Sequence, residues 1–154
     1  MVAGASFVIV IDNNVLVQLL TDKQASDKLS CYLQQENRTL ILPTPVLAEF
    51  LAHDHNKRRT SHLITPNSCL SIAPFDHIAA MICGELGDML DKTKANKPKQ
   101  KVKVDLQILS IAIATRAKSI LTEDTDIIKI IKALDLQIKF ITLSDIPNDM
   151  PLFD

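Results

Sequence analysis

Short apolar runs alternate with longer amphipathic stretches along most of the chain. The apolar runs predict strands at 7–11, 39–42, 70–73, 119–122 and 137–141. The amphipathic stretches predict helices at 15–20, 26–36, 44–56, 76–90, 104–118 and 127–135. Alternating strands and helices are the signature of an α/β fold with a mainly parallel sheet. We therefore expect a three-layer α/β/α architecture in which helices cover both faces of the central sheet.

The first apolar run leads directly into polar residues. Its five large apolar side chains, FVIVI at 7–11, are followed by Asp12, Asn13 and Asn14. A continuous apolar run is typical of a strand that is buried on both faces. Ligand crevices in open parallel sheets form at the carboxyl ends of strands, where the strand order reverses. Asp12 is therefore expected at such a crevice. The alternative is that Asp12 or Asn13 only caps the helix that follows.

The predicted helix at 44–56 carries an acid in its apolar stripe. It opens with Thr44 and Pro45, a cap residue followed by a proline at the first helical position. Glu49 lies in the stripe, so its carboxylate either pairs with a cation or points toward the rim. His53 shares its helical face, where an ordinary surface pair is the alternative to a metal pair.

The sequence gives specific predictions for three other segments. The helix at 26–36 is expected to begin at its cap residue Ser26. The chain from Leu143 onward contains two prolines and is expected to be an extended surface segment or docking arm. The helix at 76–90 is expected to bury one apolar face, formed by Ile78, Met81, Ile82 and Leu86.

Composition limits the class of protein. The 154 residues, 47% of them hydrophobic, suit one domain that buries its core without staples. Cys31, Cys69 and Cys83 lie in apolar sequence, which fits reduced thiols and a cytoplasmic setting. No apolar run is long enough to span a bilayer, so no membrane association is expected. The net charge of −1 gives no overall basic field, so nucleic-acid binding would need a local patch.

One such patch is the segment KTKANKPKQKVK at 92–103, which holds six lysines and no acid. It is interpreted either as a solvated loop or as a contact for a polyanion. The segment leads into Asp105, which is expected in the first turn of the helix at 104–118, where the macrodipole favours an anion. Lys101 and Lys103 are the lysines closest to Asp105 and the best candidates for contact with a polyanion.

Acidic residues are predicted to meet at one edge of the sheet. With right-handed crossovers, the strands that precede Asp12 and Asp124 end at the same edge. Glu49 and Asp105 can join them from neighbouring helices. Four such carboxylates repel one another unless a divalent cation neutralises them, and oxygen-only ligands select Mg²⁺ or Mn²⁺. A cation held in this way supports hydrolysis of a phosphodiester.

Four motifs occur in an order that resembles the PIN-domain family. They are VIDNN, TPVLAEFL, VDLQILSIAIATRA and LTEDTDI, and the resemblance extends over about 7–141. It is strongest to the VapC-type toxin ribonucleases of bacterial toxin–antitoxin pairs, and it implies one PIN-like domain over 1–154. By this resemblance, Asp12, Glu49, Asp105 and Asp124 bind Mg²⁺ or Mn²⁺ and activate water for RNA cleavage.

The resemblance also implies supporting roles. Asn14 and Thr122 match polar positions that help to hold the site. Asp126 is either a further metal ligand or the cap of the helix at 127–135. Ile127 stands where the family often has an aromatic residue, a departure that concerns substrate choice rather than chemistry.

The implied function is that of a metal-dependent endoribonuclease acting as a cytoplasmic toxin. Its partners would be an RNA substrate, an antitoxin protein that lies near the acidic cleft, and a second copy in a homodimer. The alternative is a PIN-like RNA-binding or protein-interaction module with weak or no catalysis. A receiver domain would need adjacent acids after the first strand, and a haloacid dehalogenase phosphatase would need an aspartate where Asn14 stands, so both are disfavoured.

Overall fold

The computed structural model describes residues 8–35, 38–53, 70–93 and 99–146. The predicted helix ends at 36 and at 54–56, Cys69 and the tail after 146 lie outside these residues.

The described residues form a five-stranded sheet in which all neighbouring strands are parallel. Its strands are β1 (Val8–Ile11), β2 (Thr39–Pro43), β3 (Leu70–Ala73), β4 (Ser119–Leu121) and β5 (Lys139–Ile141). The strand order β3-β2-β1-β4-β5 places β1 in the middle. The chain adds β2 and β3 on one side of β1 and then crosses to the other side with β4. The carboxyl end of β1 is therefore the topological switch point of the sheet.

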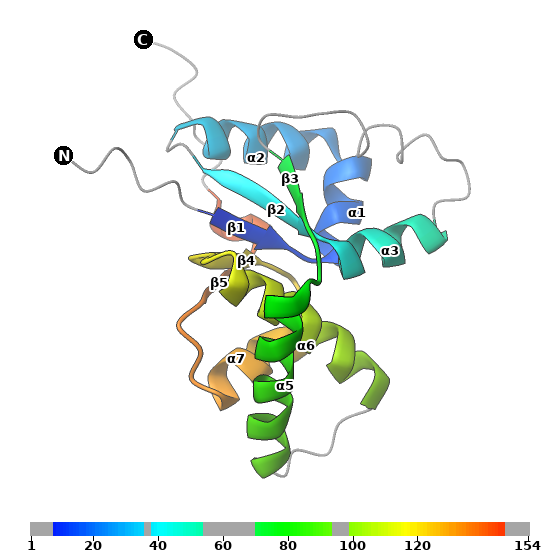
Figure 1. Cartoon of the computed structure of the whole chain (residues 1–154). Coiled ribbons are helices and arrows are strands. Elements are labelled where there is room, and N and C mark those ends of the chain that lie inside the picture. The colour runs from blue at the N-terminus through cyan, green and yellow to red at the C-terminus, as the bar shows by residue number, and fades with distance from the viewer. Residues whose placement is uncertain (1–7, 36–37, 54–69, 94–98, 147–154) are drawn as a thin grey trace, which may run out of the picture.

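Helices cover both faces of the sheet, as predicted (Figure 1). The helices of the described residues are α1 (Asn13–Thr21), α2 (Lys23–Gln35), α3 (Thr44–His53), α5 (His77–Lys92), α6 (Lys99–Ala114) and α7 (Thr125–Ala133). In Figure 1, α1 and α2 lie on one side of the sheet and α5, α6 and α7 on the other. This arrangement confirms the three-layer α/β/α architecture.

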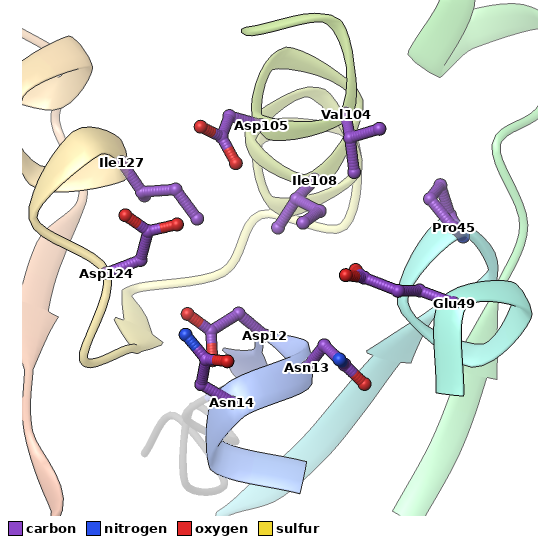
Figure 2. A pocket seen from close by; sticks show the side chains of 10 residues that line it. All are labelled: Asp12, Asn13, Asn14, Pro45, Glu49, Val104, Asp105, Ile108, Asp124 and Ile127. Carbon is purple, nitrogen blue, oxygen red and sulfur yellow. The ribbon is translucent and has the colours of Figure 1, made fainter. Parts of the chain in front are cut away.

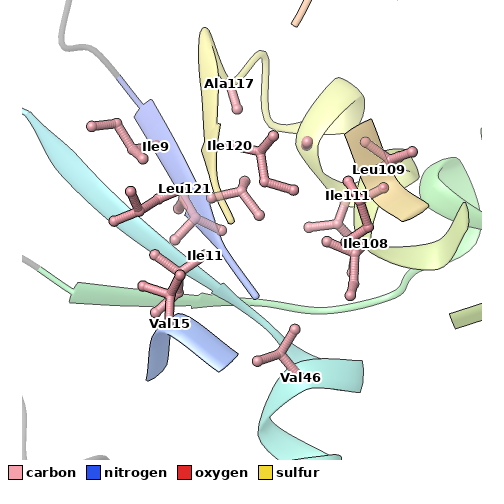
Figure 3. Packing of buried hydrophobic residues seen from close by; sticks show 14 of the residues in the cluster. Ile9, Ile11, Val15, Val46, Ile108, Leu109, Ile111, Ala117, Ile120 and Leu121 are labelled. Atoms are coloured by element: carbon pink, nitrogen blue, oxygen red, sulfur yellow. The ribbon is translucent and has the colours of Figure 1, made fainter. Parts of the chain in front are cut away.

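The core is formed by the apolar strand residues and the helices packed on them (Figure 3). Ile11 and Ile120, on neighbouring central strands, are completely buried, and Leu109 of α6 is buried with them. Val15 of α1 and Val46 of α3 are also inaccessible to solvent. The uninterrupted apolar run of β1 is thus explained by burial on both faces, as predicted.

Helices α1 and α7 begin two residues earlier than predicted, and α2 and α6 begin earlier by three or more. Helix α2 begins at Lys23 rather than Ser26, because Asp22 Oδ1 accepts hydrogen bonds from the N–H groups of Gln24 (3.0 Å) and Ala25 (3.4 Å). Helix α6 begins at Lys99, five residues before the expected start at 104. Lysine and glutamine are good helix formers, so the second half of the lysine-rich segment extends this helix instead of forming a loop.

The predicted buried face of α5 was partly wrong. Leu86 is buried and Ile82 half-buried, but Ile78 and Met81 are 59% and 62% exposed. The buried side is formed instead by Ala79, Leu86 and Leu90. The helical period was correct, but α5 packs mainly on α6, so only part of its wide apolar surface is covered.

The described part of the tail that was predicted to be extended, 143–146, is not extended. It forms a short 3-10 helix, Leu143–Asp145, in which Asp145 accepts a hydrogen bond from the N–H of Thr142 at 2.8 Å. Leu143 and Ile146 are buried, so this turn closes one end of the core. The strand before it is also shorter than predicted, beginning at Lys139 rather than at 137.

Two observations concern the cysteines and the search for a helix that could span a membrane. Cys31 and Cys83 are free, half-buried thiols. Within the described ranges, no helix combines the length and the apolar character needed to cross a membrane.

Candidate functional site

A cleft of about 600 Å³ opens at the switch point of the sheet. Four carboxylates from different elements line it (Figure 2): Asp12 after β1, Glu49 on α3, Asp105 on α6 and Asp124 after β4. The remaining lining residues are Asn13, Asn14, Pro45, Val104, Ile108 and Ile127. The structure thus brings together the four acids that were predicted to converge.

Asp12 is the most enclosed of these acids and is also a helix cap. Only 3% of its surface is exposed. Its Oδ1 accepts a hydrogen bond from the Val15 N–H at 3.0 Å, which caps α1. Its Oδ2 accepts a hydrogen bond from the hydroxyl of Thr122. Asp12 therefore both caps α1 and lies at the crevice, although the sequence presented these two roles as alternatives.

Thr122 connects Asp12 to the next acid. Its fully buried hydroxyl donates to Asp12 and accepts a hydrogen bond from the Asp124 N–H at 2.9 Å. Asp124 in turn caps α7, because its Oδ1 accepts from the Asp126 N–H at 2.8 Å. This series of hydrogen bonds fixes both aspartates at the carboxyl ends of β1 and β4.

Burial raises the pKa of the Asp12 carboxyl above its ordinary value of 3.8. The hydrogen bonds from Thr122 and Val15 act in the opposite direction, because they stabilise the carboxylate. The nearby charges of Asp124 and Glu123 raise the pKa further. A cation bound in the cleft would lower this pKa and so oppose the effects of burial and of the neighbouring negative charges.

Asp105 occupies a different position on its helix from the one expected. It lies in the second turn of α6, so the idea that it interacts with the helix macrodipole in the first turn is wrong. Its side chain is almost completely buried, at 4% exposure. Val104 and Ile108 flank it on the same helix and form part of the cleft wall. Such a buried acid is held by tertiary packing rather than by helix-end electrostatics.

Glu49 was predicted to face a cation or to point to the rim. Glu49 is exposed, while the adjacent Phe50 is buried in the core. Figure 2 shows its carboxylate reaching into the cleft from the side opposite Asp124. Glu49 therefore needs no partner to offset burial.

Among the other predicted residues, Asp126, His53 and Lys103 do not line the cleft. Asp126 lies in the first turn of α7, and the cap of that helix is Asp124, so the cap role proposed for Asp126 is wrong. His53 is exposed at the end of α3 and is not a lining residue. Lys103 is exposed on α6, and the side chain of Lys101 is outside the described residues.

Asn13 is a polar cleft residue for which the sequence offered only the role of a helix cap, which Asp12 takes instead. It lines the cleft as the first residue of α1, beside Asn14, which is exposed and was predicted to support the site. The signal was present in its position directly after Asp12, but polar residues there are also common at helix starts.

The donor set suits a hard divalent cation in its chemistry. All four acids offer oxygen atoms, which are the ligands that Mg²⁺ and Mn²⁺ prefer. As the side chains lie, however, the described residues contain no group of three or more His, Cys, Asp or Glu arranged to hold a metal ion. Their roles as metal ligands stay predictions.

Solved structures share the fold. VapBC2 from Rickettsia felis, bound to a DNA fragment from its promoter, matches with a TM-score of 0.67 and 21% identity, covering 88% of this chain and 98% of that chain. VapBC-1 from nontypeable Haemophilus influenzae matches with a TM-score of 0.65 and 14% identity, covering 90% and 99%. FitAcB from Neisseria gonorrhoeae gives 0.60 and 18%, covering 85% and 96%. At such identities the likeness shows a common fold.

Sequence comparison identifies the family. No curated protein matches the chain significantly. The model of the PIN domain matches residues 9–133, which include all four acids of the cleft and most of the chain. The chain therefore belongs to the PIN domain family.

Proposed function

We propose that this protein is a metal-dependent endoribonuclease that hydrolyses RNA phosphodiester bonds. The observation that carries the proposal is the meeting of Asp12, Glu49, Asp105 and Asp124 in one cleft at the switch point of the sheet. Two of them, Asp12 and Asp105, are almost completely buried. Acids kept at such positions have an unfavourable desolvation free energy that a bound cation offsets. Membership of the PIN domain family supports the same function.

These four carboxylates would hold Mg²⁺ or Mn²⁺. When bound, such a cation lowers the pKa of a water molecule and stabilises charge on a phosphoryl oxygen. The protein's own contribution begins with orientation, because the Thr122 hydroxyl and the Val15 N–H fix both oxygens of Asp12. Ile108 and Ile127 give the cleft an apolar wall that limits water around the reacting groups.

The lysines of α6 would attract the RNA. Lys103 is exposed on α6, directly before Val104 and Asp105, which both line the cleft. Lys101 belongs to the same part of the proposal from its position in the sequence. Their contribution is expected through phosphate contacts, which carry no base specificity.

The finer proposal is that the nuclease is the toxin of a toxin–antitoxin pair in the cytoplasm. The solved VapBC chains of the same fold support this idea. A cognate antitoxin would cover the acidic cleft, for example with an arginine among the carboxylates. The toxin would act as a homodimer, and the exposed Ile78 and Met81 of α5 are apolar side chains that pairing could bury.

The second candidate function is a PIN-like module that binds RNA or protein without cleaving it. One observation favours it, namely that the acids of the described residues are not arranged to share an ion as they lie. The nuclease needs these acids to come closer together around an ion, whereas a binding module needs no such change.

Cleavage of a mixed pool of structured RNAs separates the two functions. Purified protein is incubated with Mg²⁺ or Mn²⁺, with EDTA, and as the Asp12→Asn variant. The proposal expects metal-dependent cleavage that the variant lacks, because asparagine keeps the shape of the side chain but loses its charge. Metal binding without any cleavage would favour the binding module.

Expression in a susceptible host tests the toxin role separately. Growth arrest that is relieved by a neighbouring small antitoxin gene is the expected result. Harmless expression of a protein that cleaves RNA in vitro would remove the toxin role and leave the nuclease.

Sedimentation velocity of the wild type and Met81→Lys tests the homodimer, which should dissociate in the variant.

A further inference from the structure

Asn13 has an unusual environment for a polar residue of the cleft. Its Oδ1 is completely buried, and no described residue donates a hydrogen bond to it. In Figure 2 its amide lies between α1 and α3, on the Glu49 side of the cleft and away from Asp124. Asn13 follows Asp12 directly, so both residues come from the same turn at the start of α1.

The neighbouring part of the site contrasts with this. Both oxygens of Asp12 accept hydrogen bonds, and the Thr122 hydroxyl both donates and accepts. Buried acceptors in native proteins nearly always have a donor, and one without a donor is unfavourable. An acceptor that lacks a donor, on a side chain that lines a carboxylate cleft, points to a partner that binds there.

The chemistry of the surroundings limits what this partner is. Asp12 and Glu49, the acids on either side of Asn13, have no proton to donate when ionised. The partner must therefore be a donor or a cation. Water held by a divalent cation is a strong donor, and amide oxygens are accepted ligands in sites of hard cations. The terminal torsion of asparagine is soft, and its Oδ1 gives up no hydrogen bond on turning.

We propose that Asn13 is a further positioning residue of the cation site. Its Oδ1 turns into the cleft and accepts a hydrogen bond from a water molecule of the hydrated divalent cation. The inference rests on the proposed metal dependence and adds an uncharged oxygen to the four acids. It also explains the missing donor, because the partner arrives only with the ion.

Two substitutions test this with opposite expectations. Asn13→Leu keeps a similar volume but removes the oxygen, and Asn13→Asp keeps the oxygen but adds a fifth negative charge. Mn²⁺ affinity is measured by calorimetry, and the thermal midpoint is measured in EDTA. Asn13→Leu should weaken Mn²⁺ binding about 10-fold or more, the effect typical of outer-shell residues, and raise the midpoint of the metal-free protein. Asn13→Asp should bind Mn²⁺ at least as tightly as the wild type and lower that midpoint.

Gln18→Ala is the matched control, because Gln18 is an exposed amide on α1 that does not line the cleft. It should leave the Mn²⁺ affinity unchanged. Unchanged affinity in Asn13→Leu, with normal binding by the wild type, would overturn the role of Asn13 and leave the proposed function standing. A wild-type protein that binds no Mn²⁺ would overturn both.

Discussion

The hydroxyl of Thr122 donates a hydrogen bond to Oδ2 of Asp12 across 110 positions of the chain. Both residues are buried at the carboxyl ends of the neighbouring strands β1 and β4. The bond therefore depends on the strand order and fixes the direction of the Asp12 carboxylate. Thr122 acts on the cleft through Asp12, as a positioning residue.

Removal of this hydroxyl should affect stability and pH dependence together. Thr122→Val leaves a buried carboxylate oxygen without its donor, which should lower the free energy of unfolding by about 1.5–3 kcal/mol. The Thr122 hydrogen bond also holds down the pKa of Asp12, so its loss should move the acidic limb of the cleavage rate to higher pH. Chemical denaturation and a pH–rate profile measure the two effects.

Thr122→Ser serves as the control for volume and hydroxyl chemistry. Serine keeps the donor, so the acidic limb should stay close to that of the wild type. A shift of equal size in Thr122→Ser, which keeps the hydroxyl, would show that loss of the hydrogen bond is not the cause of the shift.

Asp12→Asn should stabilise the metal-free protein at neutral pH. The folded-state pKa of Asp12 is raised above 3.8, so between these values the folded state binds more protons than the unfolded state. The free energy of unfolding therefore falls as the pH rises through this window, and asparagine avoids the fall. Thermal scans in EDTA should show a higher midpoint for the variant at pH 7, with about 2–4 °C for each kcal/mol.

This advantage should disappear below the ordinary pKa, where Asp12 is protonated in both states. Asp27→Asn, at an exposed position on α2, is the control for the loss of one negative charge and should leave the midpoint at pH 7 close to that of the wild type. An Asp12→Asn variant less stable than the wild type at pH 7 would contradict a raised pKa.

Glu49→Gln should separate function from stability most clearly. Because Glu49 is exposed, the change should alter the free energy of unfolding by less than about 0.5 kcal/mol. If Glu49 binds the cation, cleavage should fall by about 100-fold or more. Full activity in this variant would remove Glu49 from the site and leave three acids.

Lys103→Ala should weaken RNA binding in a manner that depends on salt. Loss of one phosphate contact should reduce the slope of log affinity against log salt by about 1. Lys23→Ala is a suitable comparison, since Lys23 is exposed on α2, in the helix layer on the other side of the sheet. Equal effects of both substitutions would indicate a general charge effect instead of a contact near the cleft.

The elements and the four convergent acids were predictable because local patterns encode them. Apolar runs mark the parallel strands, and the carboxyl ends of such strands meet at one edge, which places Asp12 beside Asp124. The burial of Asp12 and Asp105 was not visible locally, since it depends on how α6 packs against the sheet.

Other features depended on tertiary contacts that a linear pattern does not contain. The apolar period of α5 gave the correct helix but not which part of its surface α6 covers, so the exposure of Ile78 and Met81 was missed. The start of α6 was misplaced because lysines were assigned to a solvated loop, although they also extend helices. The role of Asn13 was missed because the lack of a hydrogen-bond donor to its Oδ1 is visible only in the folded structure.

Single-turnover cleavage of the RNA pool by the wild type and Asp105→Asn, as a function of Mn²⁺ concentration, is the most direct test of the central claim. Asp105 is suited to it because its place in the cleft depends entirely on the fold. The account predicts no cleavage in EDTA, a rate that saturates with Mn²⁺ for the wild type, and a loss of about 100-fold or more in the folded variant. Cleavage that persists in EDTA, or equal rates for both proteins, would contradict a metal site built from these carboxylates.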